Sequence, residues 1–129
     1  MQLISEEVGL GVIAEENFSI GESICEYPGD LISAAEGKRR WRAYSDEQAN
    51  RLFFFGKFCL DPNSNLEVGA FINHSLKDPN LVVCRRNKKG KIPSIMFSAK
   101  RNIVKGEELT YDYGDRNKDS VKRNPWLLS

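Results

Sequence analysis

The chain has 129 residues, of which 40% are hydrophobic and 29% are charged, and this composition fits one globular domain and excludes two. The 19 basic and 18 acidic residues give a net charge of +1, which excludes a strong overall field for capturing nucleic acid. The longest apolar run, at residues 52–55, is too short to cross a bilayer, and the first residues lack the pattern of a secretory signal. We therefore expect an intracellular protein with no membrane association.

Short β-prone segments separated by turn signals follow one another along the chain, so we predict a mainly β fold with few short helices. A glycine-bracketed turn is predicted at Gly9-Leu10-Gly11, after a first strand. The predicted strands are residues 11–14, 23–27, 52–60, 81–86, 92–99 and 108–111. Residues 81–99 read as a hairpin whose basic turn centres on Lys89-Gly90.

Two helices are predicted. Residues 33–36 (Ser-Ala-Ala-Glu) form a capping-box pattern that opens a helix in which Ala34, Trp41 and Tyr44 share one face. Gly37 should weaken this helix, because glycine is a poor helix former. A short polar helix is also predicted at about residues 117–123, before Pro125 stops it.

Single residues give weak functional signals. The three cysteines (Cys25, Cys59 and Cys84) are well separated and form no CxxC pair, so they predict neither a zinc site nor a disulfide framework. His74 is the one histidine, and taken alone it is more often a hydrogen-bonded core residue than a site residue. Tyr111 and Tyr113 would project to the same side of a strand, but from spacing alone such a pair is more often structural.

Several short blocks in a fixed order are more specific than any single residue. Residues 9–14 (GLGVIA), 18–22 (FSIGE), 26–32 (EYPGDLI), 71–75 (FINHS) and 106–114 (GEELTYDYG) follow one another. This series resembles the SET-domain lysine methyltransferases. The ending, with residues 113–119 (YGDRNKD) and 124–127 (NPWL), resembles the histone H4 lysine monomethyltransferases of animals.

The resemblance implies a SET-domain fold of several small β-sheets around a C-terminal pseudoknot. In such a fold the Asn73-His74-Ser75 segment passes close to the Tyr111-Asp112-Tyr113 segment. The implied division is a SET domain at residues 1–114 and a C-terminal flank without zinc at residues 115–129, which would complete the cofactor site.

The implied cofactor is S-adenosyl-L-methionine, and no metal is expected. The backbone at the glycine turn would follow the methionine part, the backbone of Asn73 and His74 would bind the adenine, and the Asn73 side chain would hold the ammonium group. Arg51 falls where the subgroup has an aromatic residue that touches the cofactor pocket. The residues that the resemblance assigns to the cofactor are Gly9, Leu10, Gly11, Arg51, Asn73, His74 and Trp126.

Three tyrosines match catalytic positions of the family. Tyr113 matches the tyrosine beside the transferring methyl group, and Tyr27 matches one that lines the lysine channel. Tyr111 occupies the position where phenylalanine or tyrosine sets the number of methyl groups, and a tyrosine there predicts monomethylation.

The expected function is therefore protein lysine N-methylation from S-adenosylmethionine, with a lysine of the histone H4 tail in nucleosomes as the substrate. The expected protein is a nuclear, chromosome-associated monomer that can also occur in the cytoplasm. The alternatives are a methyltransferase for a non-histone protein and a catalytically silent SET module that binds chromatin or a partner. The basic run at residues 85–91, from Arg85 to Lys91, is either a solvated hairpin tip or a contact for DNA phosphates.

Overall fold

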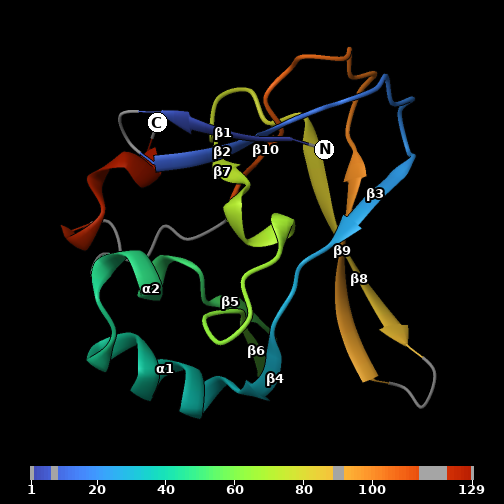
Figure 1. Cartoon of the computed structure of the whole chain (residues 1–129). Helices are drawn as coiled ribbons and strands as arrows, with labels where there is room; N and C mark the ends of the chain where they lie inside the picture. Colours follow the sequence, from blue (N-terminus) through green and yellow to red (C-terminus); the bar gives the residue numbers. More distant parts are fainter. Residues whose placement is uncertain (1, 7–8, 89–91, 114–121, 129) are drawn as a thin grey trace. The chain divides into compact units, whose positions relative to one another are not determined.

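The computed structural model describes residues 2–6, 9–88, 92–113 and 122–128. Strands dominate these residues (Figure 1), so the predicted mainly β architecture is confirmed. None of the helices in the described ranges has the length and apolar character needed to span a membrane. The chain divides into two compact units, Tyr27–Ala70, and Met1–Glu26 together with Phe71–Ser129.

The unit formed by the two ends of the chain contains three small sheets. Strands β1 (Gln2–Glu6) and β2 (Gly9–Ile13) form an antiparallel pair, and β7 (Asn73–His74) pairs in parallel with β10 (Thr110–Tyr111). The third sheet has the order β3-β9-β8, from β3 (Ser23–Glu26), β9 (Ile92–Ala99) and β8 (Leu81–Lys88). The 3₁₀ helix η2 (Pro125–Leu128) completes the assigned elements of this unit, whereas η1 (Val68–Phe71) lies mostly in the other unit, which ends at Ala70.

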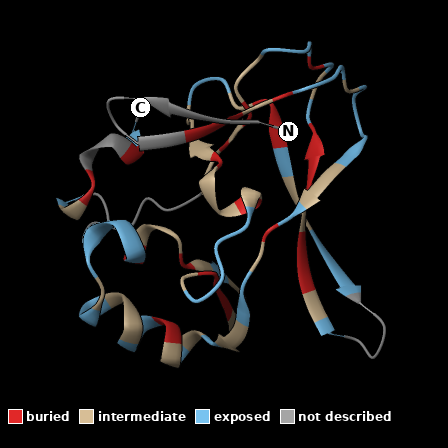
Figure 2. Cartoon of the chain, in the orientation of Figure 1, coloured by how far each residue is buried: buried red, intermediate tan, exposed pale blue. Residues whose placement is uncertain are grey.

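The long hairpin at residues 81–99 was predicted from the sequence and is confirmed. Its register runs from Leu81 opposite Ala99 to Lys88 opposite Ile92, which makes β8 longer than predicted. Most of β9 is buried (Figure 2), and Phe97 at its centre is fully enclosed. Since β9 is the central strand, its side chains supply much of the apolar core of this unit. The predicted turn at Lys89-Gly90 lies outside the described residues.

The predicted turn at Gly9-Leu10-Gly11 is wrong. These residues lie inside β2, where Glu6 is opposite Gly9 and Ile4 is opposite Gly11. The residues between β1 and β2 lie outside the described part of the structure. A glycine pair at alternate positions of a strand looks like a turn by composition, but here the pairing of β2 decides the conformation.

The unit Tyr27–Ala70 contains one sheet, two α-helices and most of η1. The sheet has the order β4-β6-β5, from β4 (Asp30–Ser33), β6 (Phe58–Asp61) and β5 (Phe53–Phe55), and its helices are α1 (Ala34–Ala43) and α2 (Asp46–Asn50). The single strand predicted at residues 52–60 is wrong, because Gly56 reverses the chain between β5 and β6 with a φ of 57°. A φ in that range costs other residues energy, so glycine sets the position of the turn.

Helix α1 begins where the sequence predicts, but its capping box is only half formed. The Ser33 side chain accepts from the Glu36 amide at 3.1 Å, whereas the Glu36 carboxylate accepts from Arg39 and Arg40 instead of returning to the cap. The complete capping box belongs to α2, between Ser45 and Gln48, and the sequence analysis did not predict that helix.

Gly37 was predicted to weaken α1, but the structure shows that packing requires a glycine at this position. Gly37 is buried, and a Cβ atom added there would lie 2.8 Å from the Cβ atom of Cys59. The glycine therefore permits a close approach of α1 to β6, although it lowers the intrinsic helix propensity.

The predicted C-terminal helix falls mostly on residues outside the described ranges. Of that segment, Lys122 and Arg123 are helical, and Asn124 is not. The 3₁₀ helix η2 then begins at Pro125. The predicted domain division at residue 114 stays a prediction.

Candidate active site

A short parallel ladder brings two distant segments of the chain together. Thr110 of β10 lies opposite Asn73 of β7, and Tyr111 lies opposite His74. The Ser75 amide extends the ladder by donating to the Tyr111 carbonyl at 3.0 Å. The labels of β7 and β10 stand close together in Figure 1. The predicted proximity of the Asn-His-Ser and Tyr-Asp-Tyr segments is therefore confirmed.

Aromatic rings cluster at this ladder. The ring of Tyr111 is 3% exposed and lies 4.7 Å, between centroids, from both the Phe97 ring and the Tyr113 ring. The His74 ring lies 4.9 Å from that of Tyr113. The Tyr111 and Tyr113 rings are neighbours, although β10 ends at Tyr111 and Tyr113 lies beyond the strand.

Both ring nitrogens of His74 are used within this unit. Nδ1 accepts from the Tyr113 amide at 3.0 Å, so in neutral imidazole the proton lies on Nε2. Nε2 can then donate to the Leu127 carbonyl, which is 2.7 Å away. His74 therefore ties β7 both to the segment after β10 and to η2. This arrangement fits a positioning role better than proton transfer.

Asn73 is oriented by an acid that the sequence analysis did not single out. Its Nδ2 donates to Glu108 Oε2 at 2.8 Å. A carboxylate can only accept, so the amide nitrogen faces Glu108 and the amide oxygen is presented elsewhere as an acceptor. Glu108 is itself placed by a bridge to Ile13 of β2, and the next residue, Leu109, donates to the Val12 carbonyl at 2.7 Å.

Asn80 is a second residue that the sequence analysis missed. It is 2% exposed, its Nδ2 donates to the Glu108 carbonyl at 2.8 Å, and its Oδ1 accepts from the Thr110 amide at 2.9 Å. One buried side chain thus holds the backbone on both sides of Leu109. The sequence signal was weak, because Asn80 follows Asp78-Pro79 and reads as an ordinary turn residue.

The other predicted site residues with described side chains, Tyr27 and Arg51, belong to the unit Tyr27–Ala70. The Tyr27 hydroxyl donates to the Arg51 carbonyl, and its 6% exposed ring lies 5.0 Å from that of Phe53. The Arg51 guanidinium contacts Glu47 at 2.7 Å and Asn63 at 3.3 Å. The structure therefore joins Tyr27 to Arg51 through the Arg51 backbone, while the Arg51 side chain makes contacts of its own.

The remaining predicted cofactor residues are described in part. Gly9, Leu10 and Gly11 lie in β2, whose partner in the register is β1. Trp126 lies in η2, but its side chain is outside the described part of the structure.

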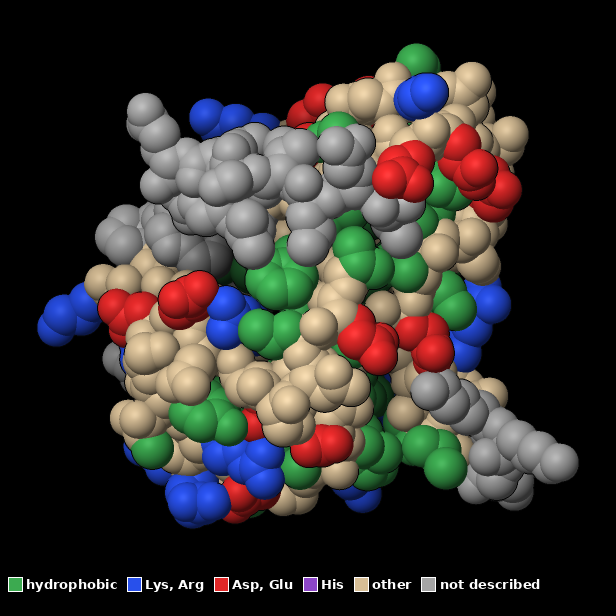
Figure 3. Space-filling view, viewed as in Figure 1, with side chains coloured by type: hydrophobic (Ala, Val, Ile, Leu, Met, Phe, Trp, Pro, Cys, Tyr) green, Lys and Arg blue, Asp and Glu red, His purple; other side chains and the backbone are tan. Residues whose placement is uncertain are grey.

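Charged side chains do not form one basic surface on the described part of the chain. Arg85 and Arg86 are exposed on β8, and Arg86 donates to the Ser23 hydroxyl at 3.1 Å, whereas residues 89–91 of the basic run lie outside the described ranges. Figure 3 shows both signs of charge interspersed over the elements of the unit that carries α1 and α2.

Metal and thiol chemistry find little support among the described residues. No cluster of three His, Cys, Asp or Glu side chains within them could hold a metal ion. The three cysteines are free. Burial raises the pKa of the Cys25 thiol to about 11 and that of the Cys59 thiol to about 12, so neither would be a thiolate nucleophile at neutral pH.

Comparison with known proteins identifies a family. The profile of the SET domain matches residues 9–114. The chain is 38% identical over 126 residues to the N-lysine methyltransferase KMT5A-B of Xenopus laevis, covering 92% of this chain and 37% of that protein. It is 40% identical over 126 residues to the histone-lysine N-methyltransferase Set8 of Drosophila melanogaster, covering 92% of this chain and 18% of that one.

A solved structure supports the same relationship. A humanized mutant of the Chaetomium thermophilum Polycomb Repressive Complex 2, bound to the inhibitor GSK126, contains a chain that superimposes with a TM-score of 0.74 at 28% identity. The match covers 93% of this chain and 15% of that one. The chain thus spans about a third of the length of its Xenopus relative and less of the other two proteins.

Proposed function

The chain belongs to the SET-domain family, and on that premise we propose that it is an S-adenosylmethionine-dependent protein lysine N-methyltransferase. The observation that carries the proposal is the parallel pairing of Asn73-His74 with Thr110-Tyr111. It brings the predicted cofactor residues of β7 together with two of the predicted catalytic tyrosines, Tyr111 and Tyr113, within one compact unit. The relatives named as lysine methyltransferases support the same reaction.

The polar groups at β7 fit the charged end of the cofactor. The cofactor carries an ammonium group, which needs acceptors and repels cations. The Asn73 amide oxygen and the Glu108 carboxylate provide acceptors from adjacent side chains, and a carboxylate adds favourable charge. When bound, S-adenosylmethionine supplies an electrophilic methyl group on a positively charged sulfur.

Tyr113 and Tyr27 would act through their hydroxyl oxygens, because each hydroxyl hydrogen is donated to a backbone carbonyl. The Tyr113 hydroxyl donates to the Ile72 carbonyl at 3.0 Å, so its oxygen can only accept further contacts. A methyl group on a sulfonium is a weak C–H donor, and each C–H···O contact contributes roughly 0.5–1 kcal/mol. Tyr113 would therefore hold the methyl group in line for transfer.

Tyr27 would act in the same way on the amine. Its hydroxyl donates to the Arg51 carbonyl, and a phenol oxygen that donates can also accept a hydrogen bond, here from an N–H of the substrate lysine. The amine of a free lysine has a pKa of about 10.4. Apolar surroundings such as the Tyr27 and Phe53 rings favour its neutral, nucleophilic form. Orienting that amine can supply roughly 7–11 kcal/mol of the barrier reduction, without a strong base.

Within this function we propose monomethylation of a histone H4 tail lysine by a nuclear, chromatin-associated protein. Tyr111 is enclosed between Phe97 and Tyr113, so its hydroxyl would restrict the space available to a second methyl group. Mass spectrometry of the product tests this point. The wild type should give monomethyl-lysine and Tyr111→Phe should add dimethyl-lysine, whereas abundant trimethyl-lysine from the wild type would contradict the proposal.

The reaction itself is tested with labelled S-adenosylmethionine and core histones, nucleosomes or a nuclear extract. Label should appear on H4 with the wild type, and Tyr113→Phe should lower the rate by about 2- to 5-fold, the loss of one C–H···O contact of roughly 0.5–1 kcal/mol. Calorimetric binding of S-adenosylmethionine to both proteins controls for folding. Cofactor binding without any labelled product would instead indicate a silent SET module, and label confined to other proteins would indicate a non-histone substrate.

A further inference from the structure

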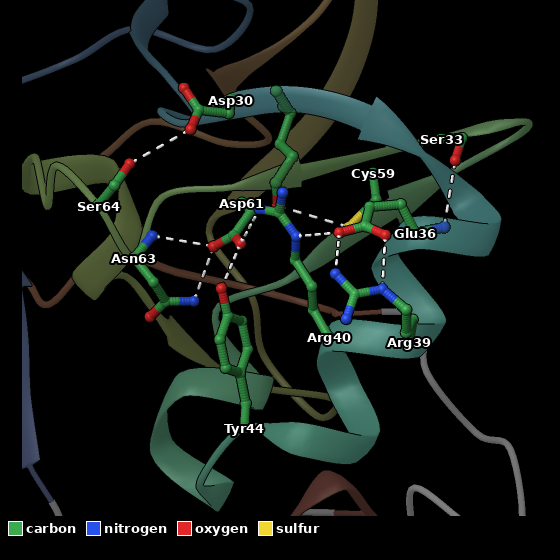
Figure 4. A network of polar contacts seen from close by, with 11 residues as sticks. Asp30, Ser33, Glu36, Arg39, Arg40, Tyr44, Cys59, Asp61, Asn63 and Ser64 are labelled. Carbon is green, nitrogen blue, oxygen red and sulfur yellow. Dashed lines mark hydrogen bonds and ion pairs between the residues drawn. The ribbon is translucent and has the colours of Figure 1, made fainter.

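A buried carboxylate organises the unit Tyr27–Ala70. The side chain of Asp61, the last residue of β6, is 3% exposed and accepts four hydrogen bonds. Oδ2 accepts from Arg40 and Tyr44, both at 2.7 Å. Oδ1 accepts from the Asn63 amide at 3.0 Å and from Asn63 Nδ2 at 2.8 Å. Figure 4 shows these three side chains converging on Asp61.

The charge of Asp61 is retained in this environment. Burial by itself raises the pKa of its carboxyl, but the hydrogen bonds from Tyr44, Asn63 and Arg40 outweigh burial, so the pKa is lowered overall. A carboxylate that is paired and fully hydrogen-bonded is a strong fixed acceptor in a buried site. Asp61 can therefore hold Asn63 in one orientation.

Asn63 uses both hydrogens and the oxygen of its side-chain amide. One Nδ2 hydrogen faces Asp61, and the other faces the Gln48 carbonyl of α2 at 3.0 Å. Oδ1 accepts from Arg51 Nη1 at 3.3 Å. Only a side chain with two donors and an acceptor can make this set of contacts, and the set ties the end of β6 to the end of α2.

The same contacts fix the residue that receives the Tyr27 hydroxyl. Arg51 caps α2, with its amide donating to the Gln48 carbonyl at 3.2 Å. Its guanidinium is held by Asn63 and by Glu47. Its carbonyl is the acceptor for the Tyr27 hydroxyl. The backbone and the side chain of Arg51 are therefore restrained together.

We propose that Asn63, held by Asp61, is a positioning residue that sets the direction of the Tyr27 hydroxyl through the Arg51 carbonyl. The proposal rests on the proposed function, in which Tyr27 accepts a hydrogen bond from the substrate amine. Loss of the Asn63 amide releases the end of α2, so the Arg51 carbonyl turns and the acceptor orbitals of Tyr27 point elsewhere. Asn63 does not touch the substrate.

Kinetics with Asn63→Ala test the proposal, and Asn65→Ala is the matched control. Asn65 is exposed in the same turn, so its replacement should change nothing. Asn63→Ala should lower kcat/KM for an H4 tail peptide by about 10-fold, the effect of losing a few net hydrogen bonds, and leave the Kd for S-adenosylmethionine within about 2-fold. Combined with Tyr27→Phe it should add almost nothing, because both changes remove one interaction.

A second measurement does not depend on activity. In protein labelled with ¹³C at the ring carbon that bears the hydroxyl of tyrosine, the Tyr27 signal is assigned by its loss in Tyr27→Phe. Asn63→Ala should shift that signal and leave those of Tyr111 and Tyr113 in place. If Asn63→Ala does not fold, Asn63→Ser, which keeps a small donor near Asp61, is measured instead.

The outcomes separate the two proposals. A lower melting temperature with an unchanged Tyr27 signal and unchanged kcat/KM would show that Asn63 only stabilises the fold and would overturn the positioning role. Fully additive effects of Asn63→Ala and Tyr27→Phe would overturn it too. If the wild type transfers no methyl group but Asn63→Ala shifts the Tyr27 signal, the proposed function fails and the positioning geometry stands.

Discussion

Replacing Gly37 by alanine would place a methyl group between α1 and the sheet of its own unit. The added Cβ would lie 2.7 Å from Phe54 Cε1, 2.8 Å from Cys59 Cβ and 2.9 Å from Cys59 Sγ. The Phe54 ring is 40% exposed and can rotate away. Cys59 is fully buried on the central strand β6, so its Cβ atom can move only if the strand or the helix moves.

Two opposing effects set the size of the change. An alanine in place of glycine within a helix gains about 1 kcal/mol of intrinsic propensity. Overpacking of a well-packed site costs about 1–3 kcal/mol. The contact with the Cβ atom of buried Cys59 places Gly37→Ala toward the costly end, so we expect a net loss of about 1–2 kcal/mol, or about 3–8 °C in melting temperature.

Thermal and urea denaturation, followed by circular dichroism, measure this effect. Ala35→Gly, at an exposed position of the same helix, is the control and should cost about 1 kcal/mol from propensity alone. The loss from Gly37→Ala should persist in a Phe54→Ala background, because Cys59 remains. A Gly37→Ala protein that melts at a higher temperature than the wild type would refute the packing argument.

Three other predictions concern acid stability and two hydrogen-bonding side chains. The unfolding free energy should fall as the pH drops below about 4, because the native pKa of Asp61 is lowered from its ordinary value of 3.8. The stabilisation from this carboxylate is present above the unfolded pKa and is lost as the pH falls toward the folded pKa. Urea midpoints measured between about pH 7 and about pH 3 should fall less steeply for Asp61→Asn than for the wild type, and equal slopes would contradict the role of this carboxylate. Asn80→Ala should lower the unfolding free energy by about 2–4 kcal/mol in urea denaturation, because it leaves two backbone groups without their partner. The control Asn87→Ala, at an exposed position, should lower it by almost nothing, and similar urea midpoints for the two variants would contradict the role of Asn80. His74→Phe keeps a ring beside Tyr113 but loses both nitrogen contacts, so its unfolding free energy should fall by about 1–3 kcal/mol, and an unchanged urea midpoint would mean that these contacts do not stabilise the fold.

The sequence predicted elements whose signals are local. The hairpin of β8 and β9 follows from two apolar segments around a basic glycine turn, and it formed as predicted. The start of α1 follows from a serine cap. The prediction failed where the same residues are compatible with two conformations. Gly9 and Gly11 are typical of a turn but lie in a paired strand, and Gly56 divides one predicted strand into two.

The meeting of two distant segments was predictable, but the side chains that support them were not. The resemblance to the SET-domain family implied that the segments of His74 and Tyr111 lie close together, and the ladder between them confirms this. Glu108, Asn80 and Asn63 were not predicted, because acids and amides in turns are common and their importance depends on partners far away in the sequence. Each of these residues makes hydrogen bonds to partners at least 12 positions away in the sequence, and such contacts leave no periodic pattern.

The ladder between β7 and β10 also has a kinetic consequence. It joins Asn73 to Thr110 through only two paired residues on each strand, so a long loop must close before the pairing contributes any stabilisation. Segments that pair across such separations form late in folding, and small ladders are the units that open first under native conditions. We therefore expect the Ser75 amide, which donates to the Tyr111 carbonyl, to exchange with solvent hydrogen sooner than the amides at the centre of β9. The aromatic cluster would then form last during folding and open first in the native state, while the rest of the fold stays intact.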